Sequence, residues 1–179
     1  RSMFREELKV NLVGIAEESI VDGPGLRYSI FCQGCPHDCL GCHNPESHVF
    51  EERTRYTLRQ ILEEVKENPL LSGVTFSGGD PVCQAEAFAE LGEMIKAETA
   101  LDVTCFTGYT YEQLLWMAGA DQAVERLLGV VDLLVDGPYV QALRDLTQQF
   151  KGSTNQRLID LKAMREAGDL QTVILWEER

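Results

Sequence analysis

Residues 73–106 read GVTFSGGDPVCQAEAFAELGEMIKAETALDVTCF, and this stretch decides the fold class. Gly73–Ser77 is short, apolar and bounded by turn residues, which predicts a buried strand. Ala85–Ala97 predicts a helix, and Leu101–Phe106 predicts a second strand. Because neighbouring parallel strands need a crossover between them, this order predicts a parallel pair joined through the helix.

The same alternation extends on both sides of this stretch. A turn at Asp22-Gly23-Pro24-Gly25 separates the first two expected strands, because Gly and Pro together interrupt any regular element. Expected strands are Leu8–Ala16, Arg27–Cys32, Val130–Val135 and a short one near Arg157–Leu161, followed after a helix by a final segment at Thr172–Trp176. Expected helices are Leu58–Glu67 with Thr57 as its cap, Tyr111–Leu128 with a break near Gly119, and Lys162–Ala167.

These elements predict one α/β domain over residues 3–179, built on a parallel sheet. Arg1 and Ser2 precede Met3 and are interpreted as a tag remnant. If the sheet curls, the result is a partial (β/α) barrel with its functional groups at the carboxyl ends of the strands. The cysteine-bearing loop and Gly78-Gly79-Asp80-Pro81 both follow strands, so we expect them at the same edge.

Charge and hydropathy exclude some classes of function. The chain has 179 residues and a formal net charge of −13, which disfavours nucleic-acid binding because phosphate contacts need a cationic surface. No apolar run approaches the roughly 20 residues of a membrane span, and no secretory signal is recognisable. We therefore expect a cytoplasmic protein with no membrane partner.

Four of the six cysteines lie close together, in residues 32–45, which read CQGCPHDCLGCHNP. Three interpretations compete: a zinc site on all four thiols, inert buried thiols, or an iron–sulfur cluster on Cys35, Cys39 and Cys42 alone. Zinc pairs are usually separated by a dozen or more residues, and here only three intervene. Burial suits Cys32, Cys83 and Cys105 as core residues, but it does not suit three cysteines in a polar loop.

The Cys-x3-Cys-x2-Cys spacing resembles the signature of the radical S-adenosylmethionine superfamily, and Gly78-Gly79-Asp80-Pro81 resembles its Gly-Gly-Glu-Pro loop with Asp in place of Glu. The resemblance implies a [4Fe–4S] cluster held by three thiolates, with S-adenosylmethionine on the open iron. The implied cofactor contacts are Gly78, Gly79 and Asp80 near the methionine amine, and Gly41, Cys42 and His43 near the adenine. Gly41 and His43 stand where much of the superfamily has aromatic residues.

Val21–Arg27 and Cys42–Glu46 resemble the segments before and after the cluster in activating enzymes of glycyl-radical proteins. Three more segments are similar to the activating proteins of anaerobic ribonucleotide reductase: Thr107–Thr110, Val135–Tyr139 and Phe150–Arg157. The resemblance implies an oxidoreductase that takes an electron from a flavodoxin-like or ferredoxin-like donor and cleaves S-adenosylmethionine. The resulting 5′-deoxyadenosyl radical would take a hydrogen atom from a glycine of the large reductase.

Alternatives remain open at this point. Asp136 follows an expected strand and could bind a cation or polar groups of the ligand, or belong to a solvated turn. The chain could also activate another glycyl-radical enzyme, or act on a small molecule as a deazaguanine-precursor synthase does. A zinc-binding module without enzymatic activity is the third, distant option.

Overall fold

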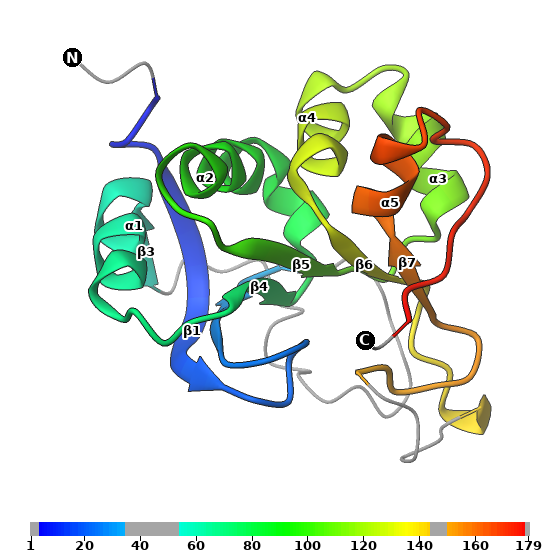
Figure 1. Ribbon diagram of the computed structural model, residues 1–179, viewed down its shortest axis with the longest axis horizontal. Helices are drawn as coiled ribbons and strands as arrows, with labels where there is room; N and C mark the ends of the chain where they lie inside the picture. The colour runs from blue at the N-terminus through cyan, green and yellow to red at the C-terminus, as the bar shows by residue number, and fades with distance from the viewer. Residues whose placement is uncertain (1–3, 35–53, 144–149, 178–179) are drawn as a thin grey trace.

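A computed structural model describes residues 4–34, 54–143 and 150–177, and it is a mixed α/β structure (Figure 1). Within these residues seven strands form one sheet, in the order β3-β1-β2-β4-β5-β6-β7. The strands are β1 Lys9–Ser19, β2 Arg27–Cys32, β3 Thr54–Thr57, β4 Gly73–Gly78, β5 Asp102–Phe106, β6 Leu133–Asp136 and β7 Arg157–Asp160. The helices are α1 Leu58–Glu67, α2 Ala85–Glu98, α3 Tyr111–Ala118, α4 Gln122–Val130 and α5 Leu161–Glu166, with short 3₁₀ turns η2 Pro81–Gln84 and η3 Gln141–Leu143.

The prediction of a parallel sheet is confirmed for the centre and wrong for the edges. The strands β2, β4, β5 and β6 are parallel, whereas β1, β3 and β7 each pair antiparallel. The tight turn between β1 and β2 cannot carry the chain back to the same end of the sheet, so β2 must return antiparallel. The strand β3 was not expected from the sequence, and it pairs with β1 immediately before α1 begins.

Local signals placed several elements at their observed bounds. The strand β2 and the helix α1 coincide with the expected ranges, and Thr57 caps α1 in a capping box with Gln60. The break near Gly119 separates α3 from α4. Val130 ends α4 instead of opening a strand, and β6 begins only at Leu133. The final expected segment contributes a single antiparallel bridge between Leu175 and Ile159.

The helices lie over one face of the sheet (Figure 1). Alternate strand residues, including Ile30, Phe76 and Val103, are fully buried, and Phe76 packs against Phe88 of α2 with ring centroids 4.7 Å apart. The residues between them in sequence point to the opposite face, because side chains alternate along a strand. Two faces of different character result, one apolar beneath the helices and one polar.

The polar face carries a row of hydroxyl side chains across the parallel strands. Ser29 of β2 lies beside Thr75 of β4, and Thr75 lies beside Thr104 of β5. All three residues are buried. The Gly78-Gly79-Asp80-Pro81 motif lies at the carboxyl end of β4, one of these parallel strands.

Candidate active site

The predicted cluster ligands Cys35, Cys39 and Cys42 lie outside the described residues, as do Gly41 and His43. Within the described ranges no group of three or more His, Cys, Asp or Glu side chains is arranged to hold a metal ion. Gly34 is the last described residue before Cys35, and it lies two residues after the end of β2. The geometry of Cys32–Gly34 therefore shows what the residues before the cysteine motif contact.

Two backbone hydrogen bonds join the residues just before Cys35 to the loop after β4. The amide of Gly79 donates to the carbonyl of Cys32 at 2.8 Å, and the amide of Asp80 donates to the carbonyl of Gly34 at 2.8 Å. These bonds continue the β2–β4 pairing beyond the ends of both strands. The structure thus brings the Gly-Gly-Asp-Pro motif to within one residue of Cys35 along the chain, as the sequence predicts.

Gly78 makes this close approach sterically possible. Its φ is +98°, a conformation that favours glycine, and a Cβ there would lie 2.6 Å from the carbonyl carbon of Phe31. The β4 chain could not pass so close to the end of β2 with any side chain at this position. Gly78 is therefore required by the backbone packing at the site, and a contact with a cofactor stays a prediction.

The carboxylate of Asp80 is fully buried and accepts hydrogen bonds from two loops. It accepts from the amide of Val82 at 3.1 Å, from the hydroxyl of Thr107 and from the amide of Gly108 at 3.0 Å. The loop after β4 is thereby joined to the loop after β5. Asp80 holds the shape of this edge, and any further role toward the methionine amine stays a prediction.

Asp136, at the end of β6, is also buried and fully engaged by protein groups. Its carboxylate accepts from the amide of Tyr111 at 2.8 Å and from the amide of Arg157 at 3.1 Å, and it pairs with the Arg157 guanidinium. The hydrogen bond to Asp136 raises the pKa of Arg157, and the hydrogen bond from Arg157 lowers the pKa of Glu112. The observed role of Asp136 is to join α3, β6 and β7, and its predicted ligand contact stays untested.

The segment Gly152–Arg157, which carries the Gly-Ser-Thr-Asn-Gln-Arg motif, is hydrogen-bonded to the turn after β6. The Gln156 side chain accepts from the amides of Gly152 and Ser153 at 2.7 and 3.2 Å, and donates to the carbonyl of Gly137 at 3.0 Å. The Asn155 amide donates to the carbonyl of Pro138 at 2.8 Å. Most polar side chains of the motif are used inside the protein, so the motif builds this edge of the site.

The turn Asp22–Gly25 is held against the polar face by the buried Arg27. The Arg27 guanidinium donates to Pro24 O at 2.8 Å and to Thr75 Oγ1 at 2.7 Å, and it pairs with Asp102 at 2.5 Å. The Thr75 hydroxyl in turn donates to Asp22 O at 2.7 Å. Arg27 and Thr107 lie in segments named from the sequence, but the sequence predicted no contact for either side chain. A signal existed for Thr107, which follows β5 as the glycine pair follows β4.

The cysteines outside the cluster motif differ from one another. Cys32 and Cys105 are fully buried, which confirms them as core residues, and burial raises the pKa of the Cys105 thiol well above its usual value. Cys83 is exposed, so its interpretation as a core residue is wrong. Partial burial and the nearby Asp80 carboxylate nevertheless raise the pKa of the Cys83 thiol to about 11.

None of the helices in the described part of the chain is long and apolar enough to cross a membrane.

Known proteins resemble this chain over most of its length. The family described as the 4Fe-4S single cluster domain matches residues 21–159. The anaerobic ribonucleoside-triphosphate reductase-activating protein of Vibrio cholerae is 34% identical over 144 residues, which cover 76% of this chain and 89% of that protein. The protein of the same name from Escherichia coli K12 is 31% identical, with coverage of 76% and 90%.

A solved structure, that of QueE from Escherichia coli, matches 60% of this chain and 55% of its own with a TM-score of 0.44 and 15% identity, too distant to support any argument. The family model spans well over half of the chain, and the two relatives are almost completely covered. The chain belongs to the family of anaerobic ribonucleoside-triphosphate reductase-activating proteins and has its 4Fe-4S single cluster domain.

Proposed function

We propose that this protein activates an anaerobic ribonucleoside-triphosphate reductase by generating a glycyl radical on the large reductase subunit. The observation that carries the proposal is the pair of hydrogen bonds from Gly79 and Asp80 to Cys32 and Gly34, each 2.8 Å long. They join the glycine-rich strand end to the residues that lead into the cysteine motif, and this supports the proposal that the two motifs form one site. The names of the relatives supply the substrate.

The cluster ligands in this proposal are the thiolates of Cys35, Cys39 and Cys42. Iron–sulfur clusters with a full protein ligand set use four cysteine thiolates, so three leave one iron open to S-adenosylmethionine. When bound, the reduced cluster supplies the electron that divides S-adenosylmethionine into methionine and a 5′-deoxyadenosyl radical, which takes a hydrogen atom from a glycine. The protein supplies binding, orientation and the exclusion of water.

The residues present support the fit of these groups. Gly78 and Gly79 form a strand end without side chains, where backbone groups can approach a ligand closely. Asp80 joins that strand end to Thr107 through a buried carboxylate, which restrains the loop. We assign Gly78, Gly79 and Asp80 to the methionine end of S-adenosylmethionine.

At the other end of the cofactor, Gly41, Cys42 and His43 are assigned to the adenine. Asp136 is assigned an indirect part, because its carboxylate already binds Tyr111 and Arg157.

We further propose that residues 3–179 form a single domain in which the mixed sheet is a partial (β/α) barrel of the radical S-adenosylmethionine type. The electron donor would be a flavodoxin-like or ferredoxin-like protein. An oxygen-labile cluster with an open iron suits an anaerobic cytoplasm.

The proposal is tested by measuring the bound iron and the cleavage of S-adenosylmethionine, with and without the large reductase. After anaerobic reconstitution we expect about four irons per chain, as a [4Fe–4S] cluster requires. With dithionite and S-adenosylmethionine the protein should form 5′-deoxyadenosine, and the large reductase should increase the amount formed per chain. One zinc ion on four thiolates, with no 5′-deoxyadenosine, would refute the proposal.

A further inference from the structure

Gln84 is the last residue of η2 and immediately precedes α2. It stands at the N-cap position of α2, but its side chain makes no hydrogen bond to that helix. Side chains at this position usually accept from one of the first amides of the helix that follows. The amide group of Gln84 instead lies between β1 and the residue that follows β2.

Three hydrogen bonds engage both ends of the Gln84 amide. Oε1 accepts from the backbone N–H of Asn11 at 2.8 Å, and Nε2 donates to the carbonyl of Asn11 at 2.8 Å and to the carbonyl of Gln33 at 3.1 Å. Gln33 is 3% exposed, so the bond to it is shielded from water. The site therefore requires one acceptor and two donors on a single side chain, which an amide provides.

The Gln84 amide takes the place of a bond in the β1–β2 ladder. In an antiparallel pair, two opposite residues can exchange two backbone hydrogen bonds. The amide of Gln33 donates to the carbonyl of Asn11 at 3.0 Å, which is the first bond of such a pair. In place of the second, the Asn11 N–H donates to Gln84 and the Gln33 carbonyl accepts from Gln84. The side chain is therefore inserted where the chain separates from β1.

This insertion completes the binding of three consecutive carbonyls ahead of Cys35. The carbonyls on either side of Gln33 accept from the backbone amides of Gly79 and Asp80. The carbonyl of Gln33 lies between them on the side of β1, where the Gln84 side chain binds it. The Gly-Gly-Asp-Pro loop and the turn η2 that follows it therefore hold the chain from both sides as it leaves β2.

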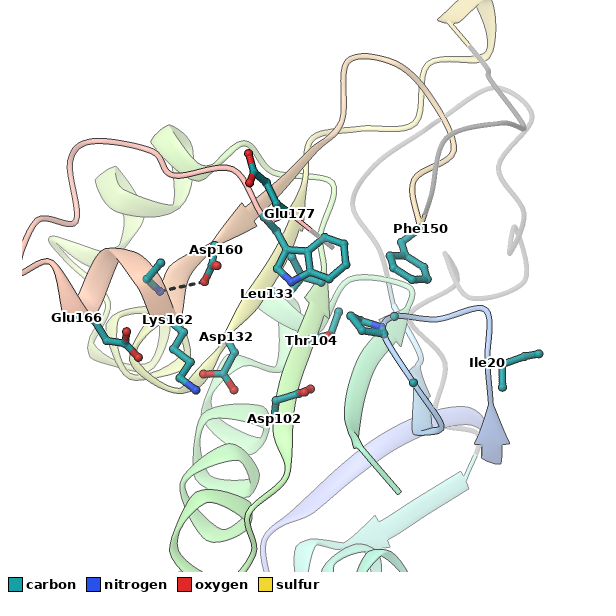
Figure 2. Close-up of a pocket in the computed structure, with 15 residues that line it drawn as sticks. Ile20, Asp102, Thr104, Asp132, Leu133, Phe150, Asp160, Lys162, Glu166 and Glu177 are labelled. Atoms are coloured by element: carbon teal, nitrogen blue, oxygen red, sulfur yellow. Dashed lines mark hydrogen bonds between the residues drawn. The ribbon is translucent and has the colours of Figure 1, made fainter. Parts of the chain in front are cut away.

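Gln84 is not part of the cavity on the polar face of the sheet. That cavity has a volume of about 670 Å³, and its lining includes Thr104 and Phe150 (Figure 2). Among the described residues, neither Gln84 nor its partners Asn11 and Gln33 belong to the lining. Gln84 therefore acts through the backbone of its partners and not by contact with a molecule in the cavity.

We propose that Gln84 is a positioning residue for the iron–sulfur cluster. Its amide sets the direction in which the chain leaves β2, and it thereby fixes the cysteine motif relative to the Gly-Gly-Asp-Pro loop. S-adenosylmethionine contacts both motifs at once, so its affinity depends on how they are held relative to each other. The proposal rests on the proposed function, which assigns the cluster to Cys35, Cys39 and Cys42.

Two substitutions separate the hydrogen bonds of Gln84 from its volume. Gln84→Met keeps the length of the side chain and removes all three bonds. Gln84→Glu keeps the shape and the acceptor for the Asn11 N–H, but it places a carboxylate against the carbonyl oxygens of Asn11 and Gln33. If the donors of Gln84 matter, Gln84→Glu should be impaired as much as Gln84→Met, although its shape is closer to that of the parent.

Gln60→Met is the matched control. The Gln60 side chain also accepts from a backbone N–H, that of Thr57 at 2.8 Å, in the capping box of α1. This bond joins neighbouring residues at the start of α1. Its loss should lower the thermal stability of the protein and leave the end of β2 unchanged.

The first measurement is amide hydrogen exchange of the metal-free protein, followed by mass spectrometry at single-residue resolution. In Gln84→Met we expect the N–H groups of Asn11 and Gln33 to exchange about tenfold faster than in the parent, because the bridge between the two strands is lost. Exchange at both positions should be unchanged in Gln60→Met. This result needs neither a cluster nor a cofactor.

The second measurement is spectroscopic and uses the reconstituted, reduced protein. Coordination of S-adenosylmethionine to the open iron changes the electron paramagnetic resonance of the cluster, so a titration gives a Kd. We expect about four irons per chain in every variant. The Kd for S-adenosylmethionine should be about tenfold higher in both Gln84 variants than in the parent, as is typical when a group that orients metal ligands is removed. Gln60→Met should have the Kd of the parent.

The proposal is overturned if either Gln84 variant binds iron and S-adenosylmethionine as the Gln60→Met control does, or if exchange at Gln33 is unchanged in Gln84→Met. Circular dichroism decides the case in which iron is lost. A folded Gln84 variant without iron supports the proposal, whereas failure of both variants to fold overturns it, because Gln84 would then be required for the fold.

A parent protein that binds neither the cluster nor S-adenosylmethionine would refute the proposed function itself. Equal binding by the parent and the Gln84 variants would overturn the positioning role alone. The reductase is absent from every one of these measurements. Their outcome is therefore distinguishable from a failure to form the glycyl radical.

Discussion

Both oxygens of the Asp80 carboxylate lie 3.0 Å from the Thr107 hydroxyl, and this buried pair joins the end of β4 to the end of β5. Gly79 and Asp80 also bind the residues that lead into the cysteine segment. The Asp80 side chain therefore connects the glycine-rich loop to the loop after β5, while the backbone amides of Gly79 and Asp80 connect that loop to the residues before Cys35.

Asp80→Asn should destabilise the protein by about 2–3 kcal/mol, because the amide nitrogen would face the backbone N–H of either Val82 or Gly108. Thr107→Val removes one donor and leaves the bonds from Val82 and Gly108 to the carboxylate intact, so about 1 kcal/mol is expected. Urea unfolding of the two variants measures the difference. Equal stability of Asp80→Asn and the parent protein would show that the carboxylate is not required to hold this edge.

Gly78→Ala should lower the free energy of unfolding by more than about 2 kcal/mol and reduce the iron bound on reconstitution. The added Cβ would overlap the backbone at the end of β2, in addition to the strain of a φ of +98°. Gly168→Ala is the matched control, since Gly168 has a φ of +71° and open space around its Cβ position. We expect about 1–2 kcal/mol there, with full iron content. A similar cost and the same iron content for both variants would contradict the close-approach argument.

Arg157→Met should destabilise the protein by about 3–5 kcal/mol. The Asp136 carboxylate is 1% exposed and would be left without its cation. Glu112→Gln removes only the exposed partner of the same guanidinium and should cost less than about 1 kcal/mol. Thermal and urea unfolding of the two variants provide the comparison. The interpretation fails if the two substitutions have equal effects.

The Cys83 thiol should react slowly with iodoacetamide at pH 8. Partial burial and the Asp80 carboxylate raise its pKa to about 11, compared with an ordinary value of 9.0. The thiolate is the nucleophile, so alkylation should be roughly 100-fold slower than in the urea-unfolded chain and should accelerate toward pH 11. Peptide mass spectrometry resolves Cys83 from the other cysteines.

The raised pKa of Cys83 also determines how the free energy of unfolding should change with pH. A folded-state pKa above the unfolded value means that the neutral Cys83 thiol stabilises the fold fully below pH 9, and that this contribution is lost as the pH rises toward 11. Cys83→Ser should therefore show a smaller loss of stability between pH 9 and 11 than the parent protein. Rapid alkylation of native Cys83 at pH 8 would contradict both expectations.

The sequence was most informative where the signal is local. The periodic apolar residues of α1 and the Thr57 cap depend only on neighbouring positions, and so does the apolar run of β2. The antiparallel edges were missed because strand direction depends on how the chain returns, which the composition of a strand does not encode. The strand β3 is four residues long and gains its definition from pairing with β1.

The candidate site was predictable in its motifs and not in its contacts. The spacing of Cys35, Cys39 and Cys42 and the Gly-Gly-Asp-Pro loop can be identified from sequence alone. The Asp80–Thr107 pair joins positions 27 residues apart; the order of the strands places both residues after parallel strands, but neither segment specifies the hydrogen bond between them. For Asp136 the sequence left open a ligand contact or a solvated turn. The structure excludes the solvated turn, because Asp136 is buried against Tyr111 and Arg157, which long-range packing brings to it; the ligand contact stays a prediction.

The most direct test of the central claim is electron paramagnetic resonance of the complete reaction. The reconstituted, reduced protein is mixed anaerobically with S-adenosylmethionine and the large anaerobic ribonucleoside-triphosphate reductase. We expect a glycyl-radical doublet on the reductase, and it should collapse to a singlet when the reductase is made with α-deuterated glycine. Formation of 5′-deoxyadenosine without any doublet would contradict the claim and would show that the radical acts on a different substrate.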